Sequence, residues 1–299
     1  MKSGIIPINK PKGLSSFAVV KRVQRLFGCD KAGHTGTLDP MAAGVLPVLL
    51  GRAVKASEYM LTSDKHYIAT LMLGITTDTE DITGTVLTEC NEIPDEGEVL
   101  AAINSMLGES EQIPPMYSAL KVDGKKLYEL ARQGITVERE GRPVRIESLT
   151  VTETDKNDEY ILYVTCSKGT YIRTLCADIG AALGCGGVMA SLRRTSLGGF
   201  RVEDAMTVTA LKELSPRELE GRVLPTEELF ADMDTVNLGD FYGRLAHSGC
   251  EIYQKMIKTA FPVGKRVRLY DKEGFFAIGE VREYPDGTAI KPIKKFRID

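Results

Sequence analysis

The sequence predicts a protein of mixed α and β structure, and three observations support this. Apolar residues recur at helical spacing in segments such as 172–183, whereas 65–74 and 160–166 are rich in β-branched and aromatic residues. Short strand-like runs also follow one another closely near the end of the chain, separated by turn residues. We therefore expect residues 233–299 to form a small all-β module.

Three helices are predicted from spacing and from end signals. The first runs from Ser16 to Gly28. The second follows a capping box formed by Asp95 and Glu98. The third ends at Gly184, a residue type that commonly terminates helices. Their inward faces are expected to carry Phe17, Val20, Val23 and Phe27; Val99, Ile103, Met106 and Leu107; and Ile172, Leu175, Cys176, Ile179 and Leu183.

Composition places the chain among soluble globular proteins. It is 43% hydrophobic and 26% charged over 299 residues, which suits one or two domains with a large core. No apolar run reaches the roughly 18 residues of a membrane span, and the amino terminus lacks the apolar core of a signal peptide. The six cysteines form no C-x-x-C pair, which argues against a disulfide framework or a zinc site. We expect a cytoplasmic protein.

Charge is unevenly distributed, although the net charge is only −3. Residues 1–31 carry seven lysines and arginines against one acid, Asp30, and basic residues recur from Lys121 to Arg145. Such local basic faces can bind phosphates even in a slightly acidic protein. For lysines taken one at a time, a solvated surface is the simpler interpretation.

The stretch Gly33–Gly44 concentrates three glycines, His34, and Asp39 followed by Pro40. Proline disfavours a helical conformation in the residue before it, so Asp39 is expected on a constrained loop. The glycines allow tight turns and the close approach of another backbone or a ligand. The apolar run 45–50 should anchor this loop in a core. From these residues alone, Asp39 is either a functional carboxylate or the cap of a turn.

Two other charged features are open to more than one interpretation. Arg173 stands in the first turn of a predicted helix, where a positive charge is unfavourable, so it either pairs with a carboxylate or is simply exposed. The acidic segment 76–84 lacks the spacing of a calcium-binding loop, and we interpret it as a solvated loop.

Several common chemistries lack their motifs in this sequence. It contains no phosphate-binding G-x-x-x-x-G-K-[ST] loop, no dinucleotide-binding glycine pattern after a strand, and no G-x-S-x-G elbow. With only three histidines, a histidine-rich metal site is not expected. A two-carboxylate glycosidase is not excluded by counting acids, but no second acid stands on a loop like that of Asp39. A single carboxylate, a candidate arginine partner, aromatic residues and basic patches remain.

Ordered motifs in the chain resemble those of the TruB pseudouridine synthases. In order along the chain they are Asn9–Ser16, Gly33–Pro47, Lys65–Tyr67, Pro115–Lys121, Lys168–Leu175 and Leu192–Thr195. They span most of residues 5–230, and their shared order makes the resemblance specific. The segment after residue 232 is similar, more loosely, to the PUA-type RNA-binding module that many members carry.

The resemblance implies an α+β fold with a mixed, mostly antiparallel central sheet. Residues 1–232 would form the catalytic domain, with an RNA-contacting insertion at about 113–145, and 233–299 a β-barrel-like PUA-type module. The implied activity is isomerisation of uridine 55 in the T-loop of tRNA to pseudouridine, on a flipped-out base and without metal or organic cofactor. The partner would be tRNA, bound at its T-loop and elbow. We expect a monomer with no obligatory protein partner and no membrane association.

The resemblance also implies a role for each matching residue. Asp39 would be the catalytic aspartate, acting either as a nucleophile at ribose carbon 1′ or as a base at carbon 2′. Arg173 would pair with Asp39 and hold it ionised and oriented.

Four further residues would contact the substrate. Tyr67 would stack on the flipped base, and His34 would contact the RNA near the vacated base position. Tyr171 and Leu192 would line the pocket, although a core role explains both equally well. Tyr171 is also a candidate for moving the proton at base carbon 5.

Two alternative functions remain possible. The first is an RNA-binding protein or tRNA-folding chaperone, for which the chemistry of Asp39 would be dispensable. The second is a guide-RNA-dependent relative that acts within a larger complex. Against the second, segment 113–145 resembles the RNA-contacting insertion of the enzymes that act alone.

Overall fold

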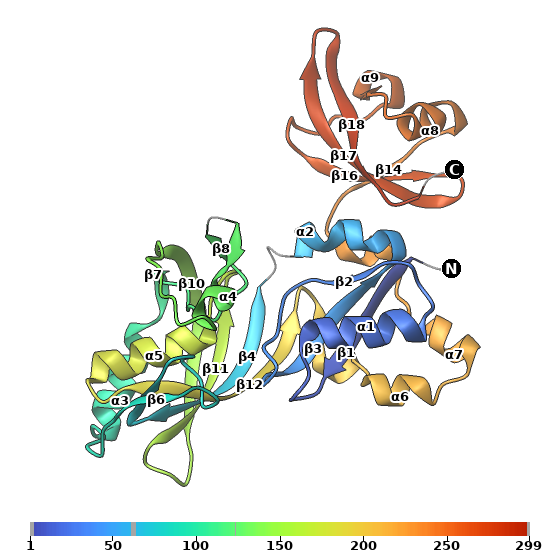
Figure 1. The fold of residues 1–299 in the computed structure, drawn as a ribbon. Helices are drawn as coiled ribbons and strands as arrows, with labels where there is room; N and C mark the ends of the chain where they lie inside the picture. Colours follow the sequence, from blue (N-terminus) through green and yellow to red (C-terminus); the bar gives the residue numbers. More distant parts are fainter. Residues whose placement is uncertain (1–2, 61–63, 123, 298–299) are drawn as a thin grey trace.

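A mixed sheet forms the centre of the computed structural model, which describes residues 3–60, 64–122 and 124–297. Within these residues nine strands join it, in the order β1-β3-β12-β4-β11-β10-β7, with β2 beside β3 and β13 beside β12 (Figure 1). The strands are β1 (Gly4–Lys10), β2 (Ala32–His34), β3 (Ala43–Leu50), β4 (Lys65–Leu73), β7 (Gly108–Gln112), β10 (Arg142–Glu153), β11 (Glu159–Cys166), β12 (Gly187–Leu197) and β13 (Phe200–Arg201). Among the described strand pairs of this sheet, only β3 and β12 run parallel. The predicted mixed, mostly antiparallel sheet is confirmed.

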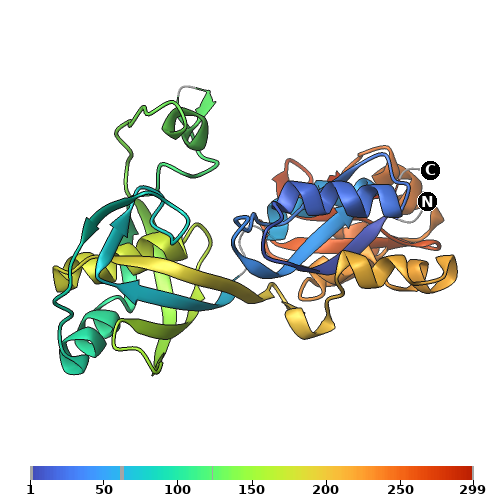
Figure 2. The same ribbon diagram turned by 60° about the horizontal axis from the view of Figure 1, so that its bottom comes forward.

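Strands β4 and β12 connect two halves of this sheet (Figures 1 and 2). They pair along the whole of β12, whereas β12 meets β3 only at Arg193 and Arg194. One apolar core lies against α5 and α3, and a second lies beneath α1 and α6. Leu38 and Met41, on either side of Asp39, belong to the first core. The Asp39 loop therefore lies where the two halves of the sheet meet.

The three predicted helices are present as α1 (Ser16–Leu26), α3 (Glu96–Ser105) and α5 (Ile172–Leu183). The capping box before α3 and the left-handed Gly184 after α5 are both observed. Two predicted core residues are wrong: Phe17 is 66% exposed and Leu107 is 45% exposed. In α1 the buried face carries Val19, Val20 and Val23, because Ser16 turns inward to bond the Asp39 loop. Leu107 lies beyond the end of α3.

A small arm projects from the sheet between β7 and β10 (Figure 2). It contains β8 (Lys121–Val122), β9 (Lys125–Lys126) and α4 (Leu127–Ala131). Met116, Leu127 and Leu130 give it an apolar core of its own. The arm lies within residues 113–145, where the family resemblance implies an RNA-contacting insertion.

A second sheet forms the end of the chain, in the order β14-β16-β17-β18-β15. Its elements are β14 (Thr235–Asn237), α8 (Asp240–His247), β15 (Ile252–Tyr253), α9 (Gln254–Ile257), β16 (Arg266–Asp271), β17 (Gly274–Tyr284) and β18 (Gly287–Lys295). The side chain of Phe230 packs between this sheet and the rest of the chain, against Ala56, Ile278 and Phe296. The expected C-terminal sheet is present, but the all-β expectation is wrong, because α8 and α9 lie within the module and α8 packs Leu245 and Ala246 against the core of the sheet. Residues 298–299, like residues 1–2 of the predicted catalytic domain, lie outside the described part of the chain.

Short elements complete the chain around these two sheets. They are η1 (Gly51–Ala56), α2 (Ser57–Met60), β5 (Ile75–Thr77), β6 (Val86–Glu89), η2 (Val202–Asp204), α6 (Val208–Lys212), α7 (Pro216–Gly221) and η3 (Thr226–Phe230). Among the described strands, β5 and β6 pair only with each other, and they hold between them the acidic segment discussed below. Among the residues described, no helix is both long enough and apolar enough to span a membrane.

Candidate active site

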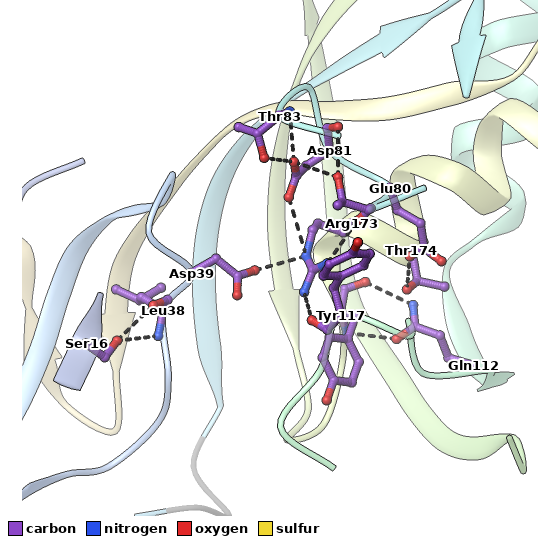
Figure 3. Close-up of polar contacts among 12 residues, drawn as sticks. Ser16, Leu38, Asp39, Glu80, Asp81, Thr83, Gln112, Tyr117, Arg173 and Thr174 are labelled. Atoms are coloured by element: carbon purple, nitrogen blue, oxygen red, sulfur yellow. Dashed lines mark hydrogen bonds and ion pairs between the residues drawn. The ribbon is translucent and has the colours of Figure 1, made fainter. Parts of the chain in front are cut away.

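The backbone of the Asp39 loop is held by the motif that precedes α1. Ser16 is buried, and its hydroxyl both donates to the Leu38 carbonyl and accepts from the Leu38 amide, each at 2.8 Å (Figure 3). The Gly13 amide donates to the Pro40 carbonyl at 2.7 Å. Two segments that are separate motifs in the sequence thus form one hydrogen-bonded unit.

Lys10 supports the same loop from below. Its side chain is fully buried, and Nζ donates to the carbonyls of Ala42 at 2.5 Å and Pro40 at 3.4 Å. Burial lowers the pKa of Lys10 to about 8, and the negative charge of Asp39 partly opposes this shift. Lys10 is therefore not part of the basic surface expected for residues 1–31. The alternation of side chains along β1 indicates this burial, since Lys10 follows Ile6 and Ile8 on the same face of the strand.

Asp39 points across the junction of the sheet toward α5. Its Oδ2 lies 3.0 Å from Nε of Arg173, so the predicted ion pair is present (Figure 3). The Asp39 backbone forms the turn, because its carbonyl accepts from the Ala42 amide at 3.0 Å. The Asp39 side chain is 34% exposed and that of Arg173 only 4% exposed. The carboxylate is thus both charge-paired and open to a ligand.

Arg173 is fixed by two carbonyl groups from distant segments. One terminal nitrogen donates to Thr79 at 2.8 Å and the other donates to Tyr117 at 2.9 Å (Figure 3). Thr79 belongs to the acidic segment, and Tyr117 lies at the base of the projecting arm. Because planar guanidinium donors fit fixed acceptors closely, these contacts orient Nε toward Asp39.

The acidic segment 76–84 is not the solvated loop that we predicted. Asp81 is only 5% exposed, and its Oδ1 accepts from the Thr83 amide at 2.9 Å and the Thr79 hydroxyl at 3.0 Å. Its Oδ2 lies 4.0 Å from Nε of Arg173. Asp81 is therefore a second carboxylate beside the arginine. The sequence feature that indicates this burial is the pair Thr79 and Thr83, two residues before and two after Asp81. Their hydroxyls can donate hydrogen bonds to a buried carboxylate.

Glu80 and Gln112 brace the start of α5. Glu80 Oε2 accepts from the Thr174 hydroxyl at 2.6 Å, and burial raises the pKa of Glu80. The Glu80 backbone is left-handed, with φ of 62°, a strain of order 1–3 kcal/mol for such a residue. The Gln112 amide bonds both the backbone N–H and the carbonyl of Tyr171, at 2.8 and 3.0 Å. The helix that carries Arg173 is thereby fixed on two sides.

The other predicted residues surround this pair at different depths. Tyr67 is buried and Leu192 is half-buried against the same apolar core, and Tyr171 is half-buried at the start of α5. His34 Nδ1 accepts from the Gly36 amide at 3.3 Å, which leaves the ring proton on Nε2. Burial, followed by the charge of Arg194, lowers the pKa of His34, so the ring is neutral at pH 7.

The arrangement is suited to carboxylate chemistry. An exposed carboxylate backed by a buried guanidinium can act on an electrophilic carbon or a weakly acidic proton. Among the described residues, no group of three histidine, cysteine, aspartate or glutamate side chains is placed to hold a metal ion.

Comparison with known proteins places these features in one family. The TruB family pseudouridylate synthase N-terminal domain matches residues 24–172, and the tRNA pseudouridylate synthase B C-terminal domain matches residues 173–231. A tRNA pseudouridine synthase B of Alkaliphilus oremlandii strain OhILAs is 44% identical over 282 residues, which cover 94% of this chain and 93% of that protein. Another, of Aromatoleum aromaticum strain EbN1, is 43% identical over 277 residues, covering 93% and 88%.

Solved structures agree with this assignment. A chain in the crystal structure of a Cbf5-Nop10-Gar1 complex is similar to this one with a TM-score of 0.74 and 26% identity, and the match covers 99% of this chain and 85% of that one. The α+β fold inferred from the sequence is therefore confirmed. On the family match, the curated relatives and this likeness, the chain belongs to the TruB family of pseudouridylate synthases and is an isomerase.

Proposed function

We propose that this protein converts uridine 55 in the T-loop of tRNA to pseudouridine, with Asp39 as its single catalytic carboxylate. The observation that carries the proposal is the ion pair of a partly exposed Asp39 with a buried Arg173. Burying an arginine is costly, and the partners that offset the cost here also direct Nε of Arg173 at the exposed carboxylate. The names of the relatives support tRNA as the substrate. We expect an enzyme that acts on tRNA to work in the cytoplasm.

Asp39 acts on the ribose of the target nucleotide. The bond between carbon 1′ and base nitrogen 1 breaks, and its electron pair stays on the base. Either an Asp39 oxygen bonds to carbon 1′, or Asp39 takes the 2′ proton. The base then turns, carbon 5 bonds to carbon 1′, and the Asp39 bond breaks or the 2′ proton returns. Carbon 5 finally loses its proton and nitrogen 1 gains one, so that the product is an isomer of the substrate. Arg173 holds Asp39 ionised and oriented throughout.

The base lies over Tyr67 after it leaves the loop stack. Stacking on this ring is worth about 1–3 kcal/mol per base in comparable settings. Leu192 and Tyr171 border the base. Tyr171 is the candidate for moving the proton at carbon 5, and the charges of Arg173 and Asp39 both act on its hydroxyl. His34 contacts the RNA beside the position that the base has left. Its neutral ring donates from Nε2.

Basic surfaces on both sides of the site hold the tRNA elbow. Lys21, Arg22 and Arg25 lie on α1, and Lys121, Lys125 and Arg132 lie on the arm. Phosphate contacts of this kind position the RNA without reading its sequence. We assign residues 1–232 to the catalytic domain and 233–299 to a PUA-like module that adds RNA contacts. The enzyme works as a monomer, without a cofactor or a protein partner.

Purified protein incubated alone with an unmodified tRNA transcript tests this function. We expect one pseudouridine, at position 55, when the product is mapped at nucleotide resolution. A transcript with cytidine at position 55 is the matched control and should remain unmodified. Modification at another position, or none without an added guide RNA or protein, would contradict the proposal.

A further inference from the structure

Arg194 is buried between the segments that carry Asp39 and Tyr67. On β12 it pairs with Gly44 of β3 on one side and with Tyr67 of β4 on the other. The strands approach so closely here that a Cβ on Gly44 would lie 2.1 Å from the Arg194 carbonyl oxygen. The glycine that we expected to admit another backbone or a ligand thus admits the backbone of Arg194.

The partners of Arg194 are unusual for a buried charge. The side chain is 1% exposed, Nε donates to the Val45 carbonyl at 2.9 Å, and a terminal nitrogen donates to Gly36 at 3.1 Å. The guanidinium also lies against the Tyr67 hydroxyl. Within the described part of the chain, none of these partners is a carboxylate, whereas Arg173 faces two. A buried charge without a counter-charge is costly, which indicates a use beyond packing.

The positive field of Arg194 extends across the floor of the site. The titratable groups around it are Lys10 on β1, His34 on β2, and Lys65 and Tyr67 on β4, with Asp39 on the loop above. Its charge adds to the burial that lowers the pKa of Lys10, His34 and Lys65. It opposes the burial that raises the pKa of Tyr67.

We propose that Arg194 is a positioning residue of the isomerisation whose buried charge favours the anion of the departing base. It links Gly36, three residues before Asp39, to the ring of Tyr67, on which the base stacks. When the bond to nitrogen 1 breaks, the base becomes negative, and a fixed cation in a dry site stabilises that charge far more than in water. The inference rests on the proposed function, because it requires that bond to break over Tyr67.

Arg194→Gln tests the charge, and Arg193→Gln is the matched control on the same strand because Arg193 is exposed. At saturating tRNA, we expect the single-turnover rate of Arg194→Gln to fall roughly 100-fold, the scale for losing one preorganised electrostatic group. The Kd for tRNA should change little. A rate for Arg194→Gln equal to that of Arg193→Gln would overturn the inference.

Arg194→Lys provides a readout that a purely structural role would not change. It keeps a charge of similar reach, so it is the more conservative variant if Arg194→Gln does not fold. A buried lysine loses its proton as pH rises, whereas arginine stays charged. We expect the rate of Arg194→Lys, relative to the wild type, to be highest at low pH and to fall as pH rises. A ratio that is independent of pH would contradict the role of the charge.

A transcript with 5-fluorouridine in place of uridine separates anion stabilisation from packing. Fluorine stabilises the base anion, so the deficit of Arg194→Gln or Arg194→Lys in consuming the target nucleotide should be smaller than with uridine. An equal deficit would overturn the inference. If wild-type protein makes no pseudouridine, or Asp39→Asn still makes it, the proposed function fails instead.

Discussion

The two sides of the active site are built in opposite ways. On the Asp39 side the backbone is fixed, by Ser16 and Lys10, and the side chain is partly exposed with one partner, Arg173. On the Arg173 side the side chain itself is fixed, because both terminal nitrogens bond carbonyl groups. The carboxylate can therefore turn toward a substrate while the guanidinium stays in place. The difference separates a group that reacts from a group that sets its charge and direction.

Among the residues that support Asp39, the largest effect is expected from removing Arg173. Arg173→Ala leaves Asp39 and Asp81 without their cation, and we expect the single-turnover rate to fall roughly 100- to 1000-fold. The Kd for tRNA should change far less, because Arg173 is buried. Arg201→Ala, at an exposed arginine, is the control and should keep its rate. Equal losses of rate and affinity in Arg173→Ala would identify an RNA contact instead of a catalytic partner.

A smaller effect is expected at the second carboxylate. Asp81→Asn keeps an oxygen for Thr79 and Thr83 but removes the charge 4.0 Å from Arg173 Nε. We expect a rate loss of about tenfold, or about 1.4 kcal/mol, which lies in the range for two unit charges about 4 Å apart. The arginine then has Asp39 as its one nearby carboxylate and holds it more tightly. Stopped-flow kinetics would measure this rate loss, and an unchanged rate would show that the charge of Asp81 does not contribute to the reaction.

On the Asp39 side, substituting the residues that hold the loop should affect stability more than the reaction rate. Ser16→Ala leaves the buried N–H and carbonyl of Leu38 without their partner, which should lower the free energy of unfolding by about 1–3 kcal/mol. The rate should fall only modestly. Ser15→Ala, which removes the cap of α1, should cost a similar stability of about 1 kcal/mol without any rate loss. Identical rates for Ser16→Ala and Ser15→Ala would show that the reaction does not need the hydrogen bonds between Ser16 and the Asp39 loop.

At Lys10 the expected effect is on the pH dependence of stability and not on the reaction rate. Its folded pKa of about 8 lies below the ordinary lysine value of 10.5, so between these values the unfolded chain binds the additional proton. Stability from this group therefore rises with pH across that window. Relative to Lys10→Met, the wild-type free energy of unfolding should increase from pH 8 toward pH 10. Denaturant titrations at several pH values would show it, and a constant difference would contradict the burial of a charged lysine.

Much of the fold was predictable because its signals are local. Helix caps, apolar spacing and turn residues located α3, α5 and the C-terminal strands, and the motifs indicated the pairing of Asp39 with Arg173. The burial of Asp81, Lys10 and Arg194 was not predicted. Each is a charged residue whose partners are backbone groups or residues distant in sequence, and such contacts exist only once the sheet has brought its strands together. The exposure of Phe17 has the same origin, because the hydrogen bonds of Ser16 to the Asp39 loop determine which face of α1 is buried.

Asp39→Asn tests the central claim most directly. The amide keeps the shape of the side chain but can neither attack carbon 1′ nor take the 2′ proton. With purified protein and unmodified tRNA under single-turnover conditions, we predict no pseudouridine at position 55, with the fold and tRNA affinity largely retained. Pseudouridine formation by Asp39→Asn at a rate close to that of the wild type would contradict the account and favour a protein that only binds and folds RNA.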